Sequence, residues 1–348
     1  MIVDQLRRRV PGGIGTYARG LLQGLRSMGP EAPEITLFAS RPPGGPDAVA
    51  ALGFPLRSSH LPGPILTRLW DHGLGGGLDA GTGIIHAVST ATPYPRDVPV
   101  AVTVHDVAWR VVPEAFPPRG RRWHEEALAR ALRRAAVVIT PSEQTAAELD
   151  AHHVEVIPEG CDHLPPADQA GADALLRRIG VATPYLLSVS TLEPRKNLAR
   201  LMEAYQLAVP RLPEPWPLVV AGAAGWGDGV MPVPGVKLAG PVDGPVLAAL
   251  YAGARCLAFV PLIEGWGLPP VEAMSACTPV VASPMPSTAH AALEVDPLNV
   301  GEIADALVAA AADERTRSRL VTAGLLRARE LTWEGAARRH VAVWDALR

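Results

Sequence analysis

The sequence predicts an α/β protein built from two Rossmann-like domains that face each other across a cleft. Three observations support this prediction. The chain has 348 residues, enough for two domains of ~150 residues each. Short apolar runs of strand length alternate with amphipathic helical segments, the pattern of a parallel sheet covered by helices. The alternation stops at the Pro-, Asp- and Ala-rich segment 162–171 and then starts again, so this segment is the expected linker.

In the first half, the apolar runs and the helical periodicity define the expected elements in order. The helix after Gly15 has Tyr17, Leu21 and Leu25 on one face. Ser142 is a suitable N-cap for another helix. Strands are expected at residues 2–5, 35–39, 84–88, 100–104, 137–140 and 154–158, and further helices at 121–134 and 142–149.

In the second half, the same alternation resumes after the linker. Strands are expected at residues 185–190, 218–221, 236–239, 256–261, 279–283 and 293–296. Helices are expected at 198–209, 246–254, from 269 onward, and at 299–312, 314–330 and 333–348.

Charge and composition exclude several classes of protein. A net charge of -3 gives no nucleic-acid-binding footprint. Cys161, Cys256 and Cys277 are far apart and lack metal-ligand spacing, which indicates a reducing compartment. No apolar run reaches the ~18 residues of a membrane helix. The first residues resemble a strand followed by arginines and not a signal peptide, so we expect a cytoplasmic protein.

The stretch Glu264-Gly-Trp-Gly-Leu-Pro-Pro-Val-Glu272 joins an apolar run to a helix. Proline suits the first helical turn, so Pro269 and Pro270 predict where this helix begins. Glu264 then lies at the carboxyl end of a strand, where ligands of open α/β sheets bind. Two carboxylates and exposed amides suit a sugar nucleotide. In the alternative interpretation, Glu264 is solvated and Glu272 only complements the helix dipole. The amides expected to be exposed belong to Gly265, Trp266, Gly267 and Leu268.

Two cations, Arg195 and Lys196, follow a predicted strand and precede a predicted helix. A helix N-terminus attracts anions, and two cations beside it suit a diphosphate. The alternative is an ordinary turn with solvated charges.

The first half offers two further candidates. Gly13 and Gly15 lie in a glycine turn between strand and helix, where the backbone can approach a ligand closely. The turn lacks the spacing of the dinucleotide fingerprint, and a bare glycine turn is the alternative. His105 ends a buried-type strand, where it could contact a sugar or handle protons; a structural histidine is the alternative.

Together these motifs resemble the family 4 retaining glycosyltransferases of the GT-B fold, nearly from end to end. The Glu-x7-Glu spacing is the most specific part of the resemblance. Two departures are Ser190-Thr191, where many members have Gly-Arg, and a short loop after Ser283. The segments that carry the resemblance are Gly12–Gly15, Val104–Asp106, Ile157–Asp162, Thr191–Asn197, Gly225–Gly227, Glu264–Met274 and Thr278–Ser283.

The resemblance implies roles for individual residues. Glu264 would contact the donor sugar and Glu272 the ribose. Arg195 and Lys196 would hold the diphosphate with the help of the amides near Gly13 to Gly15, and His105 would lie beside the donor sugar and the acceptor. The catalytic candidates are therefore His105, Glu264 and Lys196.

The resemblance also implies the domain organisation. Residues 1–163 would form an acceptor-binding domain that is completed by the last helix at 332–348. Residues 164–331 would form the domain that binds the nucleotide-sugar donor.

The function expected from these arguments is metal-independent transfer of a hexose to a glycan, glycolipid or other hydroxyl acceptor, with retention. No Asp-x-Asp metal motif is present, and no cofactor is expected besides a GDP- or UDP-linked sugar, with GDP-mannose the first choice. Two rivals are a sugar-nucleotide epimerase of the same architecture and a catalytically silent sugar-nucleotide-binding subunit.

A membrane contact is a further hypothesis. Trp109, Phe116 and Trp123 are interleaved with arginines, which suits a lipid-linked acceptor at the inner membrane face. In the alternative, this segment is a solvated helix whose arginines pair with Glu125 and Glu126.

Overall fold

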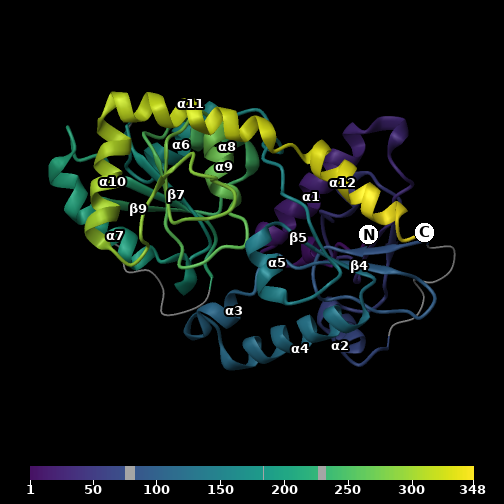
Figure 1. The fold of residues 1–348 in the computed structure, drawn as a ribbon. Coiled ribbons are helices and arrows are strands. Elements are labelled where there is room, and N and C mark those ends of the chain that lie inside the picture. Colours follow the sequence, from purple (N-terminus) through teal and green to yellow (C-terminus); the bar gives the residue numbers. More distant parts are fainter. Residues whose placement is uncertain (75–82, 183, 226–232) are drawn as a thin grey trace. The chain divides into compact units, whose positions relative to one another are not determined.

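The computed structural model describes residues 1–74, 83–182, 184–225 and 233–348. These residues form two compact units (Figure 1). Unit 1 contains residues 1–160 and 333–348, and unit 2 contains residues 161–332. None of the described helices is long and apolar enough to cross a membrane.

Unit 1 is built on a parallel sheet whose strand order is β3-β4-β5-β6. A parallel pair, β1 and β2, lies beside it, and Ile2 bridges the two sheets by pairing with both Phe38 and Ala87. The strands are β1 (Leu37–Ala39), β2 (Leu56–Ser58), β3 (Ile85–Ala87), β4 (Val100–Thr103), β5 (Val137–Thr140) and β6 (Val154–Val156).

The first strand expected from the sequence, residues 2–5, is wrong beyond Ile2. The chain turns into a 3-10 helix, η1 (Asp4–Arg7). The Asp4 carboxylate accepts a hydrogen bond from the Ser40 amide at 2.7 Å, and the Gln5 side chain donates to the Pro11 carbonyl at 2.8 Å. These polar contacts fold the segment back, so only Ile2 keeps its place in the sheet.

The helices of unit 1 cover its sheets. Ser142 caps α5 as predicted, because its hydroxyl accepts from the Thr145 amide at 3.1 Å. The α-helices are α1 (Gly12–Ser27), α2 (Gly63–Asp71), α3 (Ala108–Val111), α4 (Pro118–Arg134), α5 (Glu143–Leu149) and α12 (Trp333–Asp345). Short 3-10 turns are η2 (Gly29–Glu31), η3 (Ala50–Leu52) and η4 (Pro113–Ala115).

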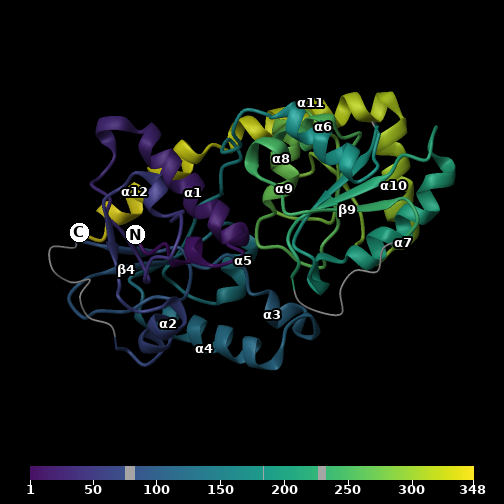
Figure 2. The same cartoon turned by 180° about the vertical axis from the view of Figure 1, so that it is seen from behind.

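The last helix, α12, packs against the first, α1, and the two lie side by side in both Figure 1 and Figure 2. Two glycines of α1 allow this approach. A Cβ at Gly20 would lie 2.1 Å from the Trp333 ring, and a Cβ at Gly24 would lie 2.0 Å from the Trp333 carbonyl oxygen. A buried hydrogen bond of 2.8 Å joins the Tyr17 hydroxyl to His340. Helix α12 therefore belongs to the packing of unit 1.

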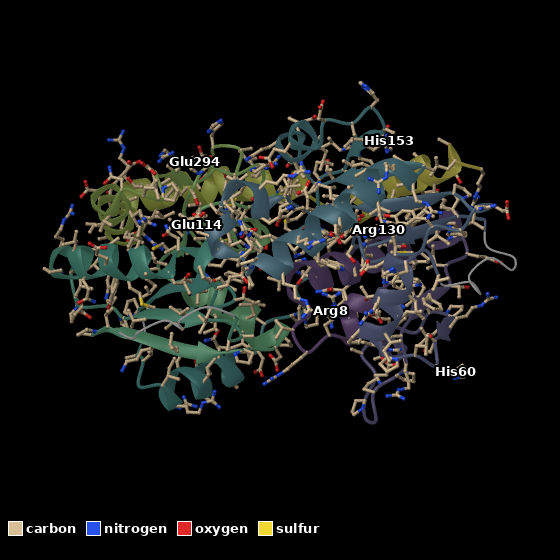
Figure 3. The ribbon with its side chains drawn as sticks, turned by 90° about the horizontal axis from the view of Figure 1, so that it is seen from below. Arg8, His60, Glu114, Arg130, His153 and Glu294 are labelled. Atoms are coloured by element: carbon tan, nitrogen blue, oxygen red, sulfur yellow. The ribbon has the colours of Figure 1, made fainter. Side chains whose placement is uncertain are left out.

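Three of the arginines around α4 pair with acidic side chains. Arg110 pairs with Glu125, which also accepts from the Trp109 indole at 2.9 Å. Arg122 pairs with Glu126 at 2.9 Å. Arg130, labelled in Figure 3, lies on the same helix and pairs with Asp71. Trp109 is buried. The pairs of Arg110 and Arg122 are those that the alternative interpretation expects, and the membrane contact stays a prediction.

Unit 2 has one parallel sheet with strand order β12-β11-β10-β7-β8-β9. Its strands are β7 (Leu186–Val189), β8 (Leu218–Ala221), β9 (Val236–Gly240), β10 (Leu257–Phe259), β11 (Val280–Ala282) and β12 (Leu293–Glu294). Its helices are α6 (Gln169–Arg178), α7 (Leu198–Ala208), α8 (Gly244–Gly253), α9 (Leu268–Ser275), α10 (Val300–Ala312) and α11 (Glu314–Glu330), with the 3-10 turns η5 (Pro194–Lys196) and η6 (Val209–Arg211).

Helices lie on both faces of this sheet, with α7 and α10 on one side and α8 and α9 on the other (Figure 1). Side chains of α7 and α10 form one buried core with the strands, including Leu201, Leu218 and Leu307. The expected linker, 162–171, is shortened at its end, because Asp168 caps α6 by accepting from the Gly171 amide at 3.0 Å.

Candidate active site

The two cations predicted to bind a diphosphate lie at the carboxyl edge of the unit 2 sheet. Arg195 and Lys196 belong to η5, the turn between β7 and α7, and not to the first turn of α7 itself. Asn197 adopts a left-handed conformation with φ +58° and lets the chain change direction into α7. Its side-chain amide donates to the Val260 carbonyl at 3.0 Å, which ties this turn to the loop after β10.

Glu264, on the loop after β10, accepts hydrogen bonds from both cations. Its Oε1 lies 2.9 Å from the Arg195 Nη1 and also receives the Lys196 ammonium. Arg195 pairs in addition with Glu193 at 2.9 Å. The three side chains that the sequence singled out as sugar and phosphate ligands therefore form one cluster, with Glu193 as its fourth member.

The cluster is electrostatically unusual because all four side chains are mostly buried. The Glu264 side chain is 12% exposed and that of Lys196 is 11% exposed. Burial lowers the pKa of Lys196, and the charge of Arg195 lowers it further, while Glu264 and Glu193 oppose the shift. Two positive and two negative charges are balanced here, so a bound polyanion would compete with the carboxylates for the cations.

The glycine loop before α9 differs from its prediction in one respect. Gly265, Trp266, Gly267 and Leu268 were expected to expose their amides, but these residues are buried. The segment after β11 contacts this loop, since its Ser287 amide donates to the Trp266 carbonyl at 3.3 Å. Gly267 caps α9 at φ +96°, and a Cβ there would lie 2.3 Å from the Met285 sulfur. Pro269 and Pro270 occupy the first helical turn as predicted.

Glu272 does more than complement the helix dipole. It is 5% exposed, and its two oxygens have different partners. Oε2 accepts from the Tyr251 hydroxyl of α8 at 2.7 Å, and Oε1 lies 3.0 Å from the His163 Nε2. Burial raises the pKa of Tyr251, and the charge of Glu272 raises it further, so the phenol stays neutral and donates. Neither Tyr251 nor His163 carried a sequence signal, because both are far from Glu272 along the chain.

In unit 1, His105 lies just after β4, at the carboxyl edge of that sheet. Its Nδ1 lies 3.2 Å from a carboxylate oxygen of Glu159, and its Nε2 lies 3.0 Å from the Val88 carbonyl oxygen. The Tyr17 ring meets the imidazole edge-on at 4.7 Å between centroids. Burial by itself lowers the pKa of His105, but the hydrogen bond and charge of Glu159, the hydrogen bond to the Val88 carbonyl and the charge of Asp106 together outweigh it, so the pKa is raised. Glu159 lies within one of the sequence motifs, but no local signal gave it a role.

The glycine turn at the start of α1 has distinct requirements at each position. Gly12 has φ +61°, and a Cβ at Gly15 would lie 2.4 Å from the Pro11 Cβ. At Gly13 no heavy atom lies within 4 Å of the Cβ position. Gly12 and Gly15 thus shape the turn, and Gly13 leaves open space beside the helix N-terminus. Tyr17, one turn along α1, brings this helix into contact with His105.

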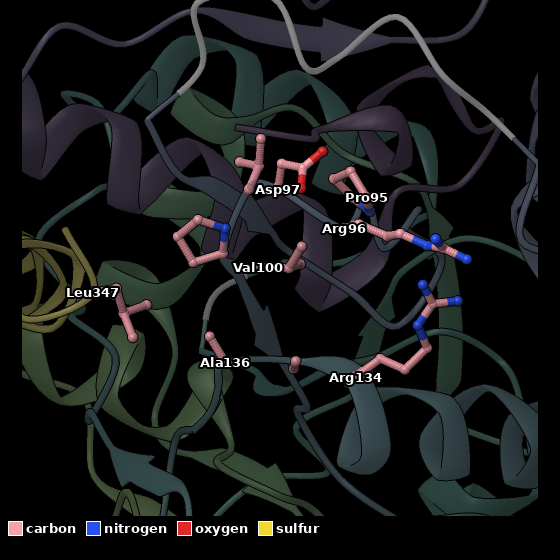
Figure 4. Close-up of a pocket in the computed structure, with 10 residues that line it drawn as sticks. Pro95, Arg96, Asp97, Val100, Arg134, Ala136 and Leu347 are labelled. Atoms are coloured by element: carbon pink, nitrogen blue, oxygen red, sulfur yellow. The ribbon is translucent and has the colours of Figure 1, made fainter.

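A cavity of about 430 Å³ lies elsewhere in unit 1 (Figure 4). It is lined by the segments that precede β4 and β5, with Arg96, Arg134 and Leu347 at its walls. This is the amino-terminal edge of the sheet, opposite to the edge that carries His105. It contains none of the predicted site residues.

Among the described residues, no three His, Cys, Asp or Glu side chains gather in a way that could hold a metal ion. Two residues of the Gly225-Trp226-Gly227 motif, Trp226 and Gly227, lie outside the described residues.

Comparison with known proteins identifies the family and the fold. Residues 11–163 match the family model "Glycosyltransferase Family 4", and residues 183–313 match the model "Glycosyl transferases group 1". The chain belongs to the family 4 glycosyltransferases of GT-B fold. This assignment favours glycosyl transfer over sugar-nucleotide epimerisation.

Individual relatives of this glycosyltransferase are distant. The O-antigen chain mannosyltransferase B of Escherichia coli is 28% identical over 265 residues, which is 70% of this chain and 70% of the relative. The sucrose-phosphate synthase of Thermosynechococcus elongatus has a TM-score of 0.75 at 21% identity and covers 99% of this chain and 98% of its own. Anabaena HepE, solved with UDP and glucose, has a TM-score of 0.72 at 17% identity, with coverages of 99% and 98%. Both structures support the fold.

Proposed function

We propose that this glycosyltransferase transfers a hexose from a nucleotide-diphospho-sugar to a hydroxyl group of a glycan or lipid-linked acceptor, with retention at the anomeric carbon. One observation carries the proposal: Arg195 and Lys196 converge on Glu264 at the carboxyl edge of the unit 2 sheet. A buried pair of cations beside a carboxylate suits a ligand that carries both a diphosphate and sugar hydroxyls.

In the proposed reaction, the two cations stabilise the negative charge that develops on the departing diphosphate. Such preorganised charge is often the largest catalytic contribution. Glu264 orients the sugar and stabilises the positive charge that grows at the anomeric carbon. We assign no covalent nucleophile; the acceptor hydroxyl attacks from the face that the diphosphate leaves, and its proton passes to the departing phosphate oxygen as the bond from that oxygen to the anomeric carbon breaks. NMR of the product tests retention directly, since an inverted anomeric proton would contradict this mechanism.

We propose a mannosyl donor, and GDP-mannose in particular, because the E. coli relative is a mannosyltransferase. HepE was solved with UDP and glucose, so UDP-glucose is the competing donor. A thermal-shift comparison separates the two. A nucleotide present at 100 times its dissociation constant stabilises the protein by roughly 2.7 kcal/mol, which is enough to rank GDP against UDP. Stronger stabilisation by UDP would overturn the GDP assignment.

We also propose that transfer needs no divalent metal, since Arg195 and Lys196 supply the positive charge beside the diphosphate. Activity in excess EDTA should equal that of the untreated enzyme. A loss that magnesium or manganese restores would refute this proposal.

The proposed setting is the cytoplasm, with a lipid-linked acceptor reached at the inner membrane face. Sedimentation with anionic vesicles tests membrane contact. The pairing of Arg122 with Glu126 leads us to expect that the double variant Arg121→Glu, Arg122→Glu sediments like the parent. A clear loss of sedimentation would restore α4 as the membrane-facing surface.

A further inference from the structure

Both ring nitrogens of His105 face hydrogen-bond acceptors. Nε2 lies 3.0 Å from the carbonyl oxygen of Val88, in the loop after β3. A carbonyl oxygen cannot donate, so Nε2 carries a proton. Nδ1 lies 3.2 Å from a carboxylate oxygen of Glu159, in the segment after β6. An ionised Glu159 also accepts, which places the second proton on Nδ1 and makes the ring an imidazolium.

The surroundings decide which partner of this pair holds the proton. Glu159 is 4% exposed, and the His105 side chain is 16% exposed. From α1, Tyr17 presents its ring, and burial raises the pKa of its hydroxyl, so it stays neutral. From β3, burial lowers the pKa of His86, so that ring stays neutral too. Asp106, next along the chain, adds a second negative charge near His105.

Among the described residues, the charges that shift the pKa of His105 are those of Glu159 and Asp106, and both favour its charged form. His340 of α12 lies behind Tyr17, and burial lowers its pKa to about 4, so it adds no positive charge at neutral pH. Opposite charges a few ångströms apart favour ionisation of both groups, and a buried ion pair needs its hydrogen bonds satisfied. The Val88 carbonyl satisfies the remaining N–H of the ring.

We propose that Glu159 is a positioning residue that keeps His105 doubly protonated, so that His105 serves the reaction as a fixed positive charge and not as a proton acceptor. The proposal rests on the proposed function and on the role that the family resemblance implies for His105, beside the donor sugar and the acceptor. With both nitrogens donating, the ring has no lone pair for a proton. No proton is transferred at this residue, and Glu159 acts only by holding the ring's charge and orientation.

The proposal has a defined pH dependence. Because the pKa of His105 is raised, the charge is complete below that pKa and is lost as pH rises through it. Glu159→Gln keeps the shape of the side chain and removes its charge, so burial then dominates and the pKa falls. An opposite charge at this distance shifts a pKa by about 1–3 units. In Glu159→Gln, the pH at which kcat/KM falls on the alkaline side should therefore decrease by a similar amount.

The first experiment needs no substrate. Protein labelled with 13C at histidine Cε1 is titrated by NMR, and the His105 signal is assigned by its loss in His105→Asn. In the parent, His105 should titrate above an ordinary histidine; in Glu159→Gln it should titrate below one. Glu155→Gln, an exposed position on β6, is the matched control and should leave the signal unchanged. Equal titration in parent and Glu159→Gln would overturn the proposal.

The second experiment measures kcat/KM across pH with the best sugar nucleotide. Glu159→Gln should approach the parent at low pH and fall earlier as pH rises, and Glu159→Asp should restore most of the profile. A purely structural role would lower activity equally at every pH, and that result would refute the proposal. If no sugar nucleotide is turned over while the NMR titration behaves as expected, the proposed function fails and the charge assignment stands.

Discussion

Neutralising Glu264 tests the cation cluster, because one carboxylate is shared by two cations. In Glu264→Gln, Lys196 loses its charged partner while Arg195 keeps Glu193. Removing one partner of a buried ion pair costs about 3–5 kcal/mol. The lower end applies here, since one cation remains paired. We therefore expect the free energy of unfolding to fall by about 3 kcal/mol, which lowers the melting temperature by roughly 6–12 °C for a domain of this size.

The same variant should bind free nucleoside diphosphate more tightly than the parent. In the parent, the diphosphate competes with Glu264 for the two cations; in Glu264→Gln it restores their missing counter-charge. If about half of the lost 3 kcal/mol returns on binding, the gain is about 1.4 kcal/mol, or tenfold in dissociation constant. Turnover should nevertheless fall strongly, because the carboxylate that stabilises the anomeric carbon is gone.

Calorimetry with GDP and UDP, thermal melting and steady-state kinetics measure the three effects. Glu314→Gln is the matched control: it removes the same charge from a carboxylate in the same unit that is 73% exposed and pairs with Arg255 and Arg317. The control should melt and bind like the parent. Weaker nucleotide binding by Glu264→Gln would show that the carboxylate assists the diphosphate instead of competing with it, and the reasoning would be refuted.

Two further predictions concern other parts of the chain. Glu272→Gln should raise the dissociation constant of the nucleotide about tenfold to a hundredfold, since a hydrogen bond to a charged group is worth roughly 1.5–3 kcal/mol. The kcat of this variant should change little. A dissociation constant equal to that of the parent would contradict the assignment of Glu272 to the ribose. The variant should also melt lower, because the Tyr251 hydroxyl loses a charged acceptor. Gly20→Ala should destabilise the protein by about 1–3 kcal/mol in chemical denaturation, since its Cβ would meet the Trp333 ring at 2.1 Å. Gly13→Ala, with open space at the Cβ, is the control and should unfold within about 1 kcal/mol of the parent.

The helices and strands that were predicted correctly are mostly those whose bounds are set by a local apolar pattern or a capping residue. The strands Val137–Thr140 and Leu218–Ala221 and the helix Glu314–Glu330 have the predicted bounds, since each is set by its own apolar pattern or cap. The first strand failed because the Asp4 carboxylate binds the Ser40 amide, a contact that no local window contains.

In the candidate site, too, some residues could be predicted from local sequence patterns and others could not. The cations and Glu264 could be singled out from the sequence, since each lies in a motif with its own local spacing. The partners of Glu272 and His105 could not, because Tyr251, His163 and Glu159 come from other elements and meet their partners only in the folded unit. Nor could the burial of the glycine loop, which the segment after β11 contacts.

The position of α12 has a consequence for how the chain folds as it is synthesised. Unit 1 is discontinuous, because residues 333–348 complete it after the whole of unit 2. Domains generally fold as units, and the N-terminal one folds first during synthesis. Here the order is inverted for the last step: all of unit 2 leaves the ribosome before Trp333 does. The glycine face of α1 stays uncovered until α12 has emerged, so the time needed to translate unit 2 sets the earliest moment at which unit 1 closes.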